Sequence, residues 1–463
     1  MSATTILSGA HATAAEAAQV RDTPASAWLM AASALLLGVG TAASSLDVGT
    51  ILVVLSLAVA AVALLVPEAR ALAALSSRSV VTLLAVGTVV EILAMAVAPP
   101  VADVRFAAIV LATGMVALHA LLFATRWRTT EFAIVVIAHV ALMSWMIAVR
   151  GPPDIDVYVF QQEGSAALLD GQNPYGLRFA NTAPPGSPYY APEVIDGDRF
   201  RFGFIYPPLS LLMALPGYAI AGDYRYAGAF AVGLTAWLLG RARPSRIAIG
   251  AALLVLFAPV TPRVLFWGWT DPFVIVLLAT SVYLAVRQSS HAPIALGLLL
   301  AVKQYAAPAL LLAVVLLDDL KARIGWRRLI VVPMAIALLT VLPFLAWDAA
   351  SFIYSTITMH SLQPFRADSL SVPALLARHG FDQAPAWAGF IAGAIALLIV
   401  LLRAPRTVAT FCGALALVLM PFFLFGKQAF MHYYFLPQVS LALGVAVTSV
   451  DRSTHVAARP AAP

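Results

Sequence analysis

Two carboxylates, Asp154 and Asp156, stand directly after a long apolar run that ends at Arg150. The Gly-Pro-Pro turn between them and that run halts a helix, because proline cannot continue one. An amphipathic helix is then expected from Val157 to about Gly171. A carboxylate pinned at such a helix start suits a general base. For Asp156 a plain helix cap, bonded to the first free amides, is the competing interpretation.

These aspartates open the most polar stretch of the chain, residues 151–206, which holds seven acidic residues, three arginines and five tyrosines. Loops of this length in a compact protein are usually functional. Two turn-forming aromatic segments, Gln172–Tyr175 and Tyr206–Leu209, are predicted to wall a sugar site through Asn173, Tyr175 and Tyr206. Anchoring of the aromatic rings at a membrane interface would account for the same residues.

Lys303 lies inside the apolar run LGLLLAVKQYAAPALLL. An ammonium there is costly unless it is paired or faces water, so Lys303 is a candidate ligand for a lipid phosphate or one half of an ion pair. Asp271, in FWGWTDPF, is a helix cap, a partner for Lys303 or a sugar ligand. Lys427 and His432, in GKQAFMHYY, are expected to contact phosphate or acceptor at the outer end of the last helix, where anchoring at the interface explains the tyrosines alone.

The elements that must position these residues are membrane helices. Of 463 residues, 62% are hydrophobic and 11% are charged, and the mean hydropathy is +0.91. Soluble domains average roughly 25% charged residues, so a soluble enzyme is excluded. The net charge of +6 comes from arginines in short loops, which indicates positive-inside topology rather than nucleic-acid binding. The single cysteine, Cys412, and the scattered histidines offer no metal site, so neither metal nor cofactor is expected.

Runs long enough to span a membrane begin near Ala27, Val48, Val80, Val104 and Phe132, then near Arg225, Ile247, Asp271, Leu329, Trp387, Val408 and Met431. Basic loops two helices apart place residues 151–206 outside the cytoplasm. The same loops make Pro208–Ile220 a short interfacial helix and Ala292–Leu317 a hairpin broken around Lys303 to Pro308. The fold class is therefore all-α, a bundle of about 12–14 helices in a cell (inner or plasma) membrane, with the long extracytoplasmic loop after the fifth helix.

The expected organisation has four parts. Residues 1–26 form a disordered tail, 27–130 an accessory region of four membrane helices, and 131–450 the catalytic membrane module. Residues 451–463 form a cytoplasmic tail. The module carries two outer loops, 150–223 and 348–385.

The motifs DIDVY, LLDGQNPY, YPPLSLLMALP, WGWTD, LLLAVKQY and GKQAFMHYYF occur in an order that resembles the GT-C superfamily of integral membrane glycosyltransferases, most nearly family 87 and its mannosyltransferase-like relatives. The resemblance spans roughly Phe132 to Val445. It implies an inverting transfer of a sugar from a polyprenyl-phosphate carrier, with Asp156 or Asp154 as base. It places the donor phosphate near Lys303, Lys427, His432 and Arg225. It places substrate at Asn173, Tyr175, Tyr206, Asp271 and Gln304.

The chain departs from the simplest pattern of that superfamily by about four helices before the first core helix and by lacking a large soluble C-terminal domain. Acceptor recognition is then expected from the loops, which favours a lipid or small glycolipid acceptor. Two other classes of function remain open. A transporter or flippase for lipid-linked sugar also uses broken helices and buried charges, and a scaffold for envelope assembly would depend on no loop carboxylate.

Overall fold

A computed structural model of the protein describes residues 24–66, 75–101, 103–126, 128–184 and 186–448. Within these residues the fold is helical, apart from two antiparallel strands of two residues each, β1 (Ile195–Asp196) and β2 (Arg199–Phe200). The expected all-α bundle is confirmed. The first described helix begins at Pro24, and the expected tails fall on residues 1–23 and 451–463, which lie outside the described residues.

In the described part of the chain, six helices are long and apolar enough to cross a membrane: α2 (Pro24–Ala42), α3 (Leu46–Leu65), α5 (Ser77–Ala96), α6 (Val104–Leu122), α7 (Arg128–Arg150) and α17 (Trp326–Trp347). The first five match the five apolar runs expected before the long loop. Polar residues set their starts: the side chains of Ser45, Ser76 and Asp103 each accept a hydrogen bond from a first-turn amide. The pair α11 (Arg246–Leu256) and α12 (Val260–Trp267), bent by 47°, adds a possible seventh span.

The other elements are shorter. In chain order they are α8 (Asp156–Leu169), η1 (Pro174–Gly176), η2 (Pro192–Val194), α9 (Pro208–Ala221), α10 (Arg225–Ala242), α13 (Asp271–Val286), α14 (Ala292–Val302), η3 (Gln304–Ala306), α15 (Pro308–Leu316), α16 (Asp318–Ile324), α18 (Ala349–Ile353), η4 (Tyr354–Thr358), α19 (Met359–Leu362), α20 (Val372–Arg378), α21 (Ala388–Arg403), α22 (Val408–Leu424), η5 (Met431–Tyr434) and α23 (Phe435–Val447).

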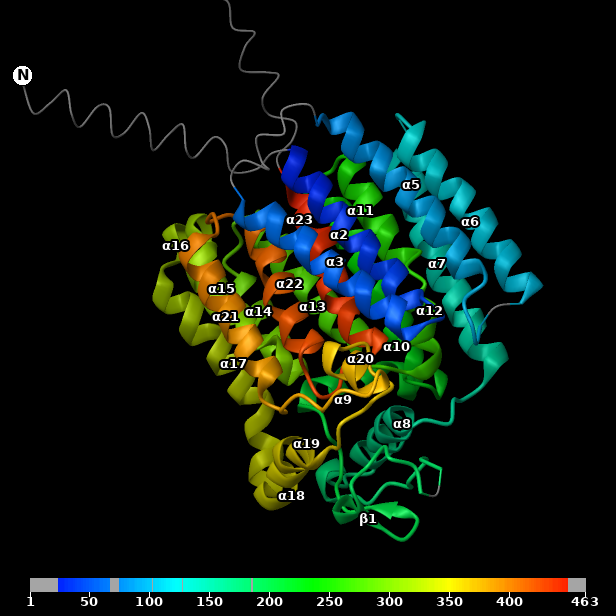
Figure 1. The fold of residues 1–463 in the computed structure, drawn as a ribbon, viewed down its shortest axis with the longest axis vertical. Helices are drawn as coiled ribbons and strands as arrows, with labels where there is room; N and C mark the ends of the chain where they lie inside the picture. The colour runs from blue at the N-terminus through cyan, green and yellow to red at the C-terminus, as the bar shows by residue number, and fades with distance from the viewer. Residues whose placement is uncertain (1–23, 67–74, 102, 127, 185, 449–463) are drawn as a thin grey trace, which may run out of the picture.

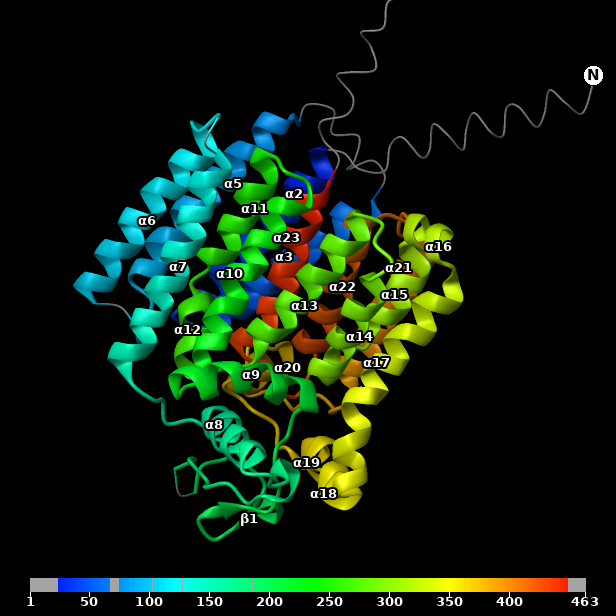
Figure 2. The same ribbon diagram turned by 180° about the vertical axis from the view of Figure 1, so that it is seen from behind.

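The bundle has two chemically different ends. Figure 1 shows α8, the two strands, α18 and α19 gathered at one end, which we call the loop end. At the opposite end, the basic end, Arg287 donates to the carbonyl of Arg241 (3.2 Å), and Arg406 lies 3.5 Å from Asp318. Figure 2 shows the same division from behind.

Helix α9 stays at the loop end, as expected for a short interfacial helix. Both of its ends contact α8: Gln161 donates to the Ser210 hydroxyl (3.5 Å), and Gln162 donates to the carbonyl of Gly222 (2.5 Å). At 14 residues α9 is also short for a span of about 20 residues.

The apolar run 292–317 is a hairpin, as predicted. Helix α14 ends at Val302, Lys303 adopts an extended conformation, and α15 runs back from Pro308. The tip reaches the start of α13 through the pair Lys303–Asp271, while the return helix leads to Asp318 at the basic end. An apolar cavity at the basic end is lined by Ala292 of α14 and Ala313 of α15, which shows that the two helices run antiparallel.

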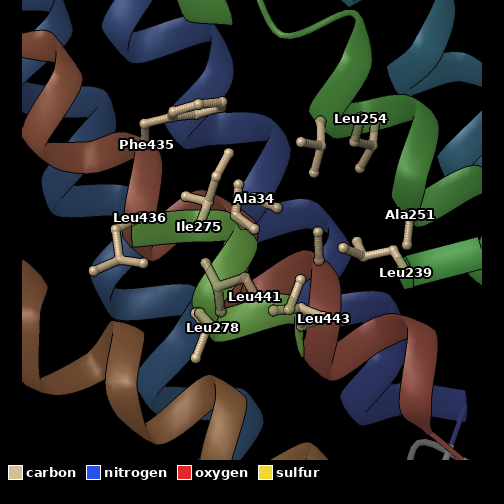
Figure 3. Packing of buried hydrophobic residues seen from close by; sticks show 14 of the residues in the cluster. Ala34, Leu239, Ala251, Leu254, Ile275, Leu278, Phe435, Leu436, Leu441 and Leu443 are labelled. Atoms are coloured by element: carbon tan, nitrogen blue, oxygen red, sulfur yellow. The ribbon is translucent and has the colours of Figure 1, made fainter. Parts of the chain in front are cut away.

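The core joins the N-terminal helices to the rest of the bundle. Figure 3 shows Ala34 of α2 packed with Ile275 of α13 and Leu441 of α23. All three are completely buried in one hydrophobic cluster. The region 27–130, expected as an accessory unit, therefore shares its core with the proposed catalytic module.

Candidate active site at the loop end of the bundle

Asp156 begins α8 and is engaged through both carboxylate oxygens. Its Oδ1 accepts the Val157 amide (2.6 Å), and its Oδ2 accepts the hydroxyl of Tyr190. The residue that caps the helix is Ile155, which makes no side-chain capping bond, so the capping interpretation accounts for only one oxygen of Asp156. Burial raises the pKa of the Asp156 carboxyl above its usual value, and these hydrogen bonds partly oppose the shift. Asp154 is exposed, so the structure distinguishes the two aspartates.

Aromatic rings form a second, smaller core beneath α8. Phe160 packs edge-on against Phe179 with ring centroids 5.1 Å apart, and Tyr190 lies 4.6 Å from Phe200. These residues come from α8 and from residues 174–204, so the long loop folds around its own rings rather than lying open. This packing fixes the position of Asp156.

Asn173, Tyr175 and Tyr206 lie together, as the expected sugar-site wall requires. The Asn173 Oδ1 accepts the Tyr175 amide (3.0 Å), and the Tyr175 hydroxyl donates to the carbonyl of Tyr206 (2.8 Å). Burial raises the pKa of Tyr206 well above its usual value. Electrostatic repulsion from Asp156, Tyr433 and Asp271 raises it further. The Lys303 ammonium, which pairs with Asp271, lies over the Tyr206 ring.

Lys303 and Asp271 form a buried ion pair, with Nζ and Oδ1 3.0 Å apart and side chains 6% and 0% exposed. The Tyr305 hydroxyl donates to the same Oδ1 (2.7 Å), and the ammonium lies 5.6 Å from the ring centre of Tyr206. Three interpretations were left open for Asp271, and the structure shows that it is the ion-pair partner of Lys303. Its second oxygen, Oδ2, has no hydrogen-bond partner among the described residues.

His432 adjoins this pair. Its ring stacks on Trp269 with centroids 4.1 Å apart, and its Nδ1 is buried without a hydrogen-bond partner in the described part of the chain. The hydroxyl of Thr270, next to Asp271, is buried and unpartnered within the same described residues. Within the described residues, three buried polar atoms of this region, Asp271 Oδ2, the Thr270 hydroxyl and His432 Nδ1, are therefore unpartnered.

Three other predicted site residues are held by protein groups. The Lys427 ammonium donates to the carbonyls of His360 (3.3 Å), Ser361 (3.2 Å) and Gln363 (2.6 Å). It therefore fastens the second outer loop to the segment before η5.

Arg225 is 2% exposed and pairs with Asp223 (2.6 Å). It also donates to the carbonyls of Gly151 (2.8 Å) and Phe266 (2.9 Å). Gln304, at the hairpin tip, donates to the carbonyl of Thr356 (3.3 Å). Both side chains join elements at the loop end.

Two site residues were missed from sequence, Tyr190 and Arg366. Arg366 comes from the second outer loop; its guanidinium lies 3.9 Å from the ring centre of Tyr189 and 4.9 Å from that of Phe430, and it pairs with Asp368 (2.6 Å). The positive charge of Arg366 lowers the pKa of Asp156. The tyrosine pair after a Pro-Gly-Ser-Pro turn was a visible signal in the sequence, whereas nothing in it places Arg366 beside Asp156.

The second outer loop also contacts the N-terminal helices. Arg378 and His379 both donate to the Asp47 carboxylate at the start of α3 (2.8 and 2.9 Å). The Tyr434 hydroxyl donates to the carbonyl of Leu370 (2.6 Å). The loop that carries Arg366 is thus held from both sides of the bundle. No group of three or more potential metal ligands occurs among the described residues.

Comparison with known proteins gives a fold-level likeness. No protein-family model and no curated protein matches the chain. Among solved structures, the chain is similar to the crystal structure of ArnT from Cupriavidus metallidurans bound to undecaprenyl phosphate, with 18% identity and a TM-score of 0.45. The match covers 70% of this chain and 60% of that one, so the chain spans less than two thirds of ArnT. At this level the similarity assigns neither a family nor an activity.

Proposed function

We propose that the protein is a membrane glycosyltransferase. It moves a sugar, mannose or another hexose or pentose, from a polyprenyl-phosphate carrier to a lipid or glycan acceptor. The reaction takes place at the extracytoplasmic face of the cell membrane, inverts the anomeric carbon and needs no metal. The order of the six motifs that resemble the GT-C superfamily supports this proposal. The observation that carries it is Asp156, a half-buried carboxylate with a raised pKa at the start of α8.

Asp156 acts as the general base. The acceptor oxygen attacks the anomeric carbon, its proton passes to Oδ2 of Asp156, and the bond from that carbon to the carrier phosphate breaks. The electron pair of the broken bond leaves on the phosphate. A carboxyl group with a raised pKa is a stronger base than an exposed one, provided that it is ionised at the working pH.

Lys303 and His432 bind the donor. The ammonium compensates the charge that develops on the carrier phosphate, a contribution that is usually large in group transfer. Asp271 pairs with Lys303 inside an apolar bundle and uses its unpartnered Oδ2 to accept a sugar hydroxyl. Lys427 and Arg225 bind the donor phosphate only if they release the main-chain carbonyl groups to which they now donate hydrogen bonds. Asn173, Tyr175 and Gln304 shape the wall of the site.

Substitution of the two aspartates tests this proposal. The purified protein in detergent is supplied with radiolabelled polyprenyl-phosphate-mannose and a membrane lipid extract. Asp156→Asn should lower transfer by about 10²–10⁴-fold, the usual contribution of a general base. Asp154→Asn is the matched control, because Asp154 is an exposed aspartate two residues away, and it should retain transfer. Full transfer by Asp156→Asn would sink the proposed mechanism.

A transporter or flippase for lipid-linked sugar is the second candidate. The buried Lys303–Asp271 pair at the tip of a re-entrant hairpin favours it, because transporters bind ions and substrates at broken helices. Vesicles that contain the protein separate the two functions. Movement of labelled sugar-lipid across the vesicle membrane without formation of a glycosylated product would favour the flippase.

A further inference from the structure

The only hydrogen bond to Oδ2 of Asp156 comes from within the long loop, from the Tyr190 hydroxyl, among the residues that the structure describes. Oδ1 is occupied by the Val157 amide, a main-chain donor fixed by α8. The donor to Oδ2 is a side chain, which an incoming hydroxyl can displace, so we place the loss of the substrate proton at Oδ2. In this structure the Tyr190 phenol donates its hydrogen bond to that oxygen.

The Tyr190 ring is packed and cannot leave without a local rearrangement. It lies 4.6 Å from the Phe200 ring and 6.0 Å from the Phe202 ring, measured between centroids. The neighbouring Tyr189 is covered by Arg366 at 3.9 Å, and Arg366 is fixed in turn by Asp368. The phenol is thus held over the carboxylate by rings of its own loop, and the second outer loop contacts the adjacent residue, Tyr189.

Burial and the adjacent Asp156 carboxylate raise the pKa of Tyr190 well above its usual value. The phenol therefore remains protonated near neutral pH and stays a hydrogen-bond donor. A hydroxyl that donates to Oδ2 has the same chemistry as the acceptor hydroxyl in the proposed reaction.

We propose that Tyr190 is a positioning residue that occupies the acceptor-hydroxyl place on Asp156 and excludes water from it until the acceptor displaces the phenol. This inference rests on the proposed function and adds a determinant of specificity to it, the choice of acceptor over water. A bound acceptor can use the binding energy of the rest of its molecule to move the ring, whereas a water molecule has no such energy.

The reaction that Tyr190 suppresses is hydrolysis of the donor. A water oxygen would bond to the anomeric carbon, one of its protons would pass to Oδ2 of Asp156, and the bond to the carrier phosphate would break. The products are free sugar and polyprenyl phosphate. The same base serves both reactions, so the ratio of hydrolysis to transfer reports which oxygen reaches it.

Tyr190→Phe removes the hydroxyl and keeps the ring on Phe200. With radiolabelled polyprenyl-phosphate-mannose and membrane lipid extract, release of free mannose relative to transferred mannose should rise by about tenfold, since a hydrogen bond to a charged group typically supplies that factor. Tyr189→Phe is the matched control, because it deletes a phenolic hydroxyl one residue away and keeps the ring against Arg366. It should leave the ratio unchanged.

A second measurement needs no turnover. Labelling of Asp156 by a water-soluble carbodiimide, mapped by mass spectrometry, should be several-fold faster in Tyr190→Phe than in the wild type or in Tyr189→Phe. Equal labelling rates in all three proteins would overturn the inference, as would an unchanged ratio of hydrolysis to transfer. Failure of the proposed function is a separate result: it would appear as full transfer by Asp156→Asn, or as movement of sugar-lipid by the wild type without a glycosylated product.

Discussion

At the residue scale, the contact between Asp156 and Tyr190 sets the pH dependence expected of the proposed reaction. Burial raises the pKa of Asp156, while the Tyr190 hydroxyl lowers it by stabilising the ionised form. Transfer needs the ionised carboxylate, so the activity is complete above the raised pKa and is lost as the pH falls through it.

The first prediction concerns that acidic limb. Tyr190→Phe removes a bond that favours the charged form, so the pKa of Asp156 should rise further and the limb of kcat/KM should move to higher pH. The measurement is the pH profile of transfer for both proteins, with Tyr189→Phe as control. A limb that moves to lower pH or stays in place would contradict this role of the phenol.

The second prediction concerns the pair Lys303–Asp271. Removal of one partner leaves a buried charge, so Lys303→Met or Asp271→Leu alone should lower the free energy of unfolding by about 3–5 kcal/mol. The double variant should lose much less than the sum of the two, because two apolar side chains can pack where the pair was. Thermal unfolding in detergent measures all three, and strictly additive losses would mean that the pair does not couple.

At the element scale, the hairpin α14–α15 depends on close packing against α17. A Cβ atom on Gly297 would lie 2.7 Å from the Ile336 Cβ and 2.8 Å from the Pro333 carbonyl oxygen. Both are closer than side-chain carbons normally approach. The glycine therefore allows α17 to lie directly on the helix that leads to Lys303.

The third prediction follows from this packing. Gly297→Ala should destabilise the protein by about 1–3 kcal/mol, the usual cost of overpacking a tight contact. Gly164→Ala in α8 is the control, since a Cβ there would meet its nearest neighbour, Leu211, at 3.4 Å, an ordinary contact. Equal melting temperatures for Gly297→Ala and the wild type would show that α17 moves away without cost.

The long helices were predictable, because each is an apolar run of recognisable length. The short helices α18, α19 and α20 and the break between α11 and α12 were not. Two departures from a simple count, the position of α9 at the loop end and the hairpin, were predictable from the positions of arginines; that α9 lies at a membrane interface stays a prediction. The sequence did not predict that the N-terminal helices share one hydrophobic core with the rest of the bundle. That α2 packs against α13 and α23 depends on contacts between segments more than two hundred residues apart, which one sequence does not reveal.

At the site the same division holds. Asp156, Lys303 and Asp271 were visible as charges in unusual places, and the pairing of the last two was one of the alternatives that the sequence left open. Tyr190 and Arg366 were missed, because a tyrosine and an arginine in polar loops are ordinary until the fold brings them together. Lys427 stood out for its charge, and only the structure shows that three carbonyl groups already hold it.

At the scale of the whole molecule, the two ends of the bundle should lie on opposite sides of the membrane. The basic end carries Arg241, Arg287 and Arg406, and positive residues are enriched on the cytoplasmic side. The loop end, with the proposed site, then lies outside the cytoplasm.

The fourth prediction tests this orientation. The single native cysteine, Cys412, is buried, so introduced cysteines can be labelled with little background. In intact cells an impermeant maleimide should label Glu193→Cys, at the loop end, and should not label Pro244→Cys, at the basic end; both native residues are exposed. Permeabilised cells, in which both should react, provide the control. The reverse pattern would place the proposed site in the cytoplasm.

The re-entrant hairpin also bears on the number of times that the chain crosses the membrane. Since α14 enters from the basic end and α15 returns to it, the hairpin adds no net crossing of the membrane. A protein from which residues 292–317 were deleted would therefore keep each later loop on its original side, even though two helices had gone. The hairpin that carries Lys303 therefore does not set the orientation of the helices that follow. Its residues, or its presence, can change without reversing those helices in the membrane.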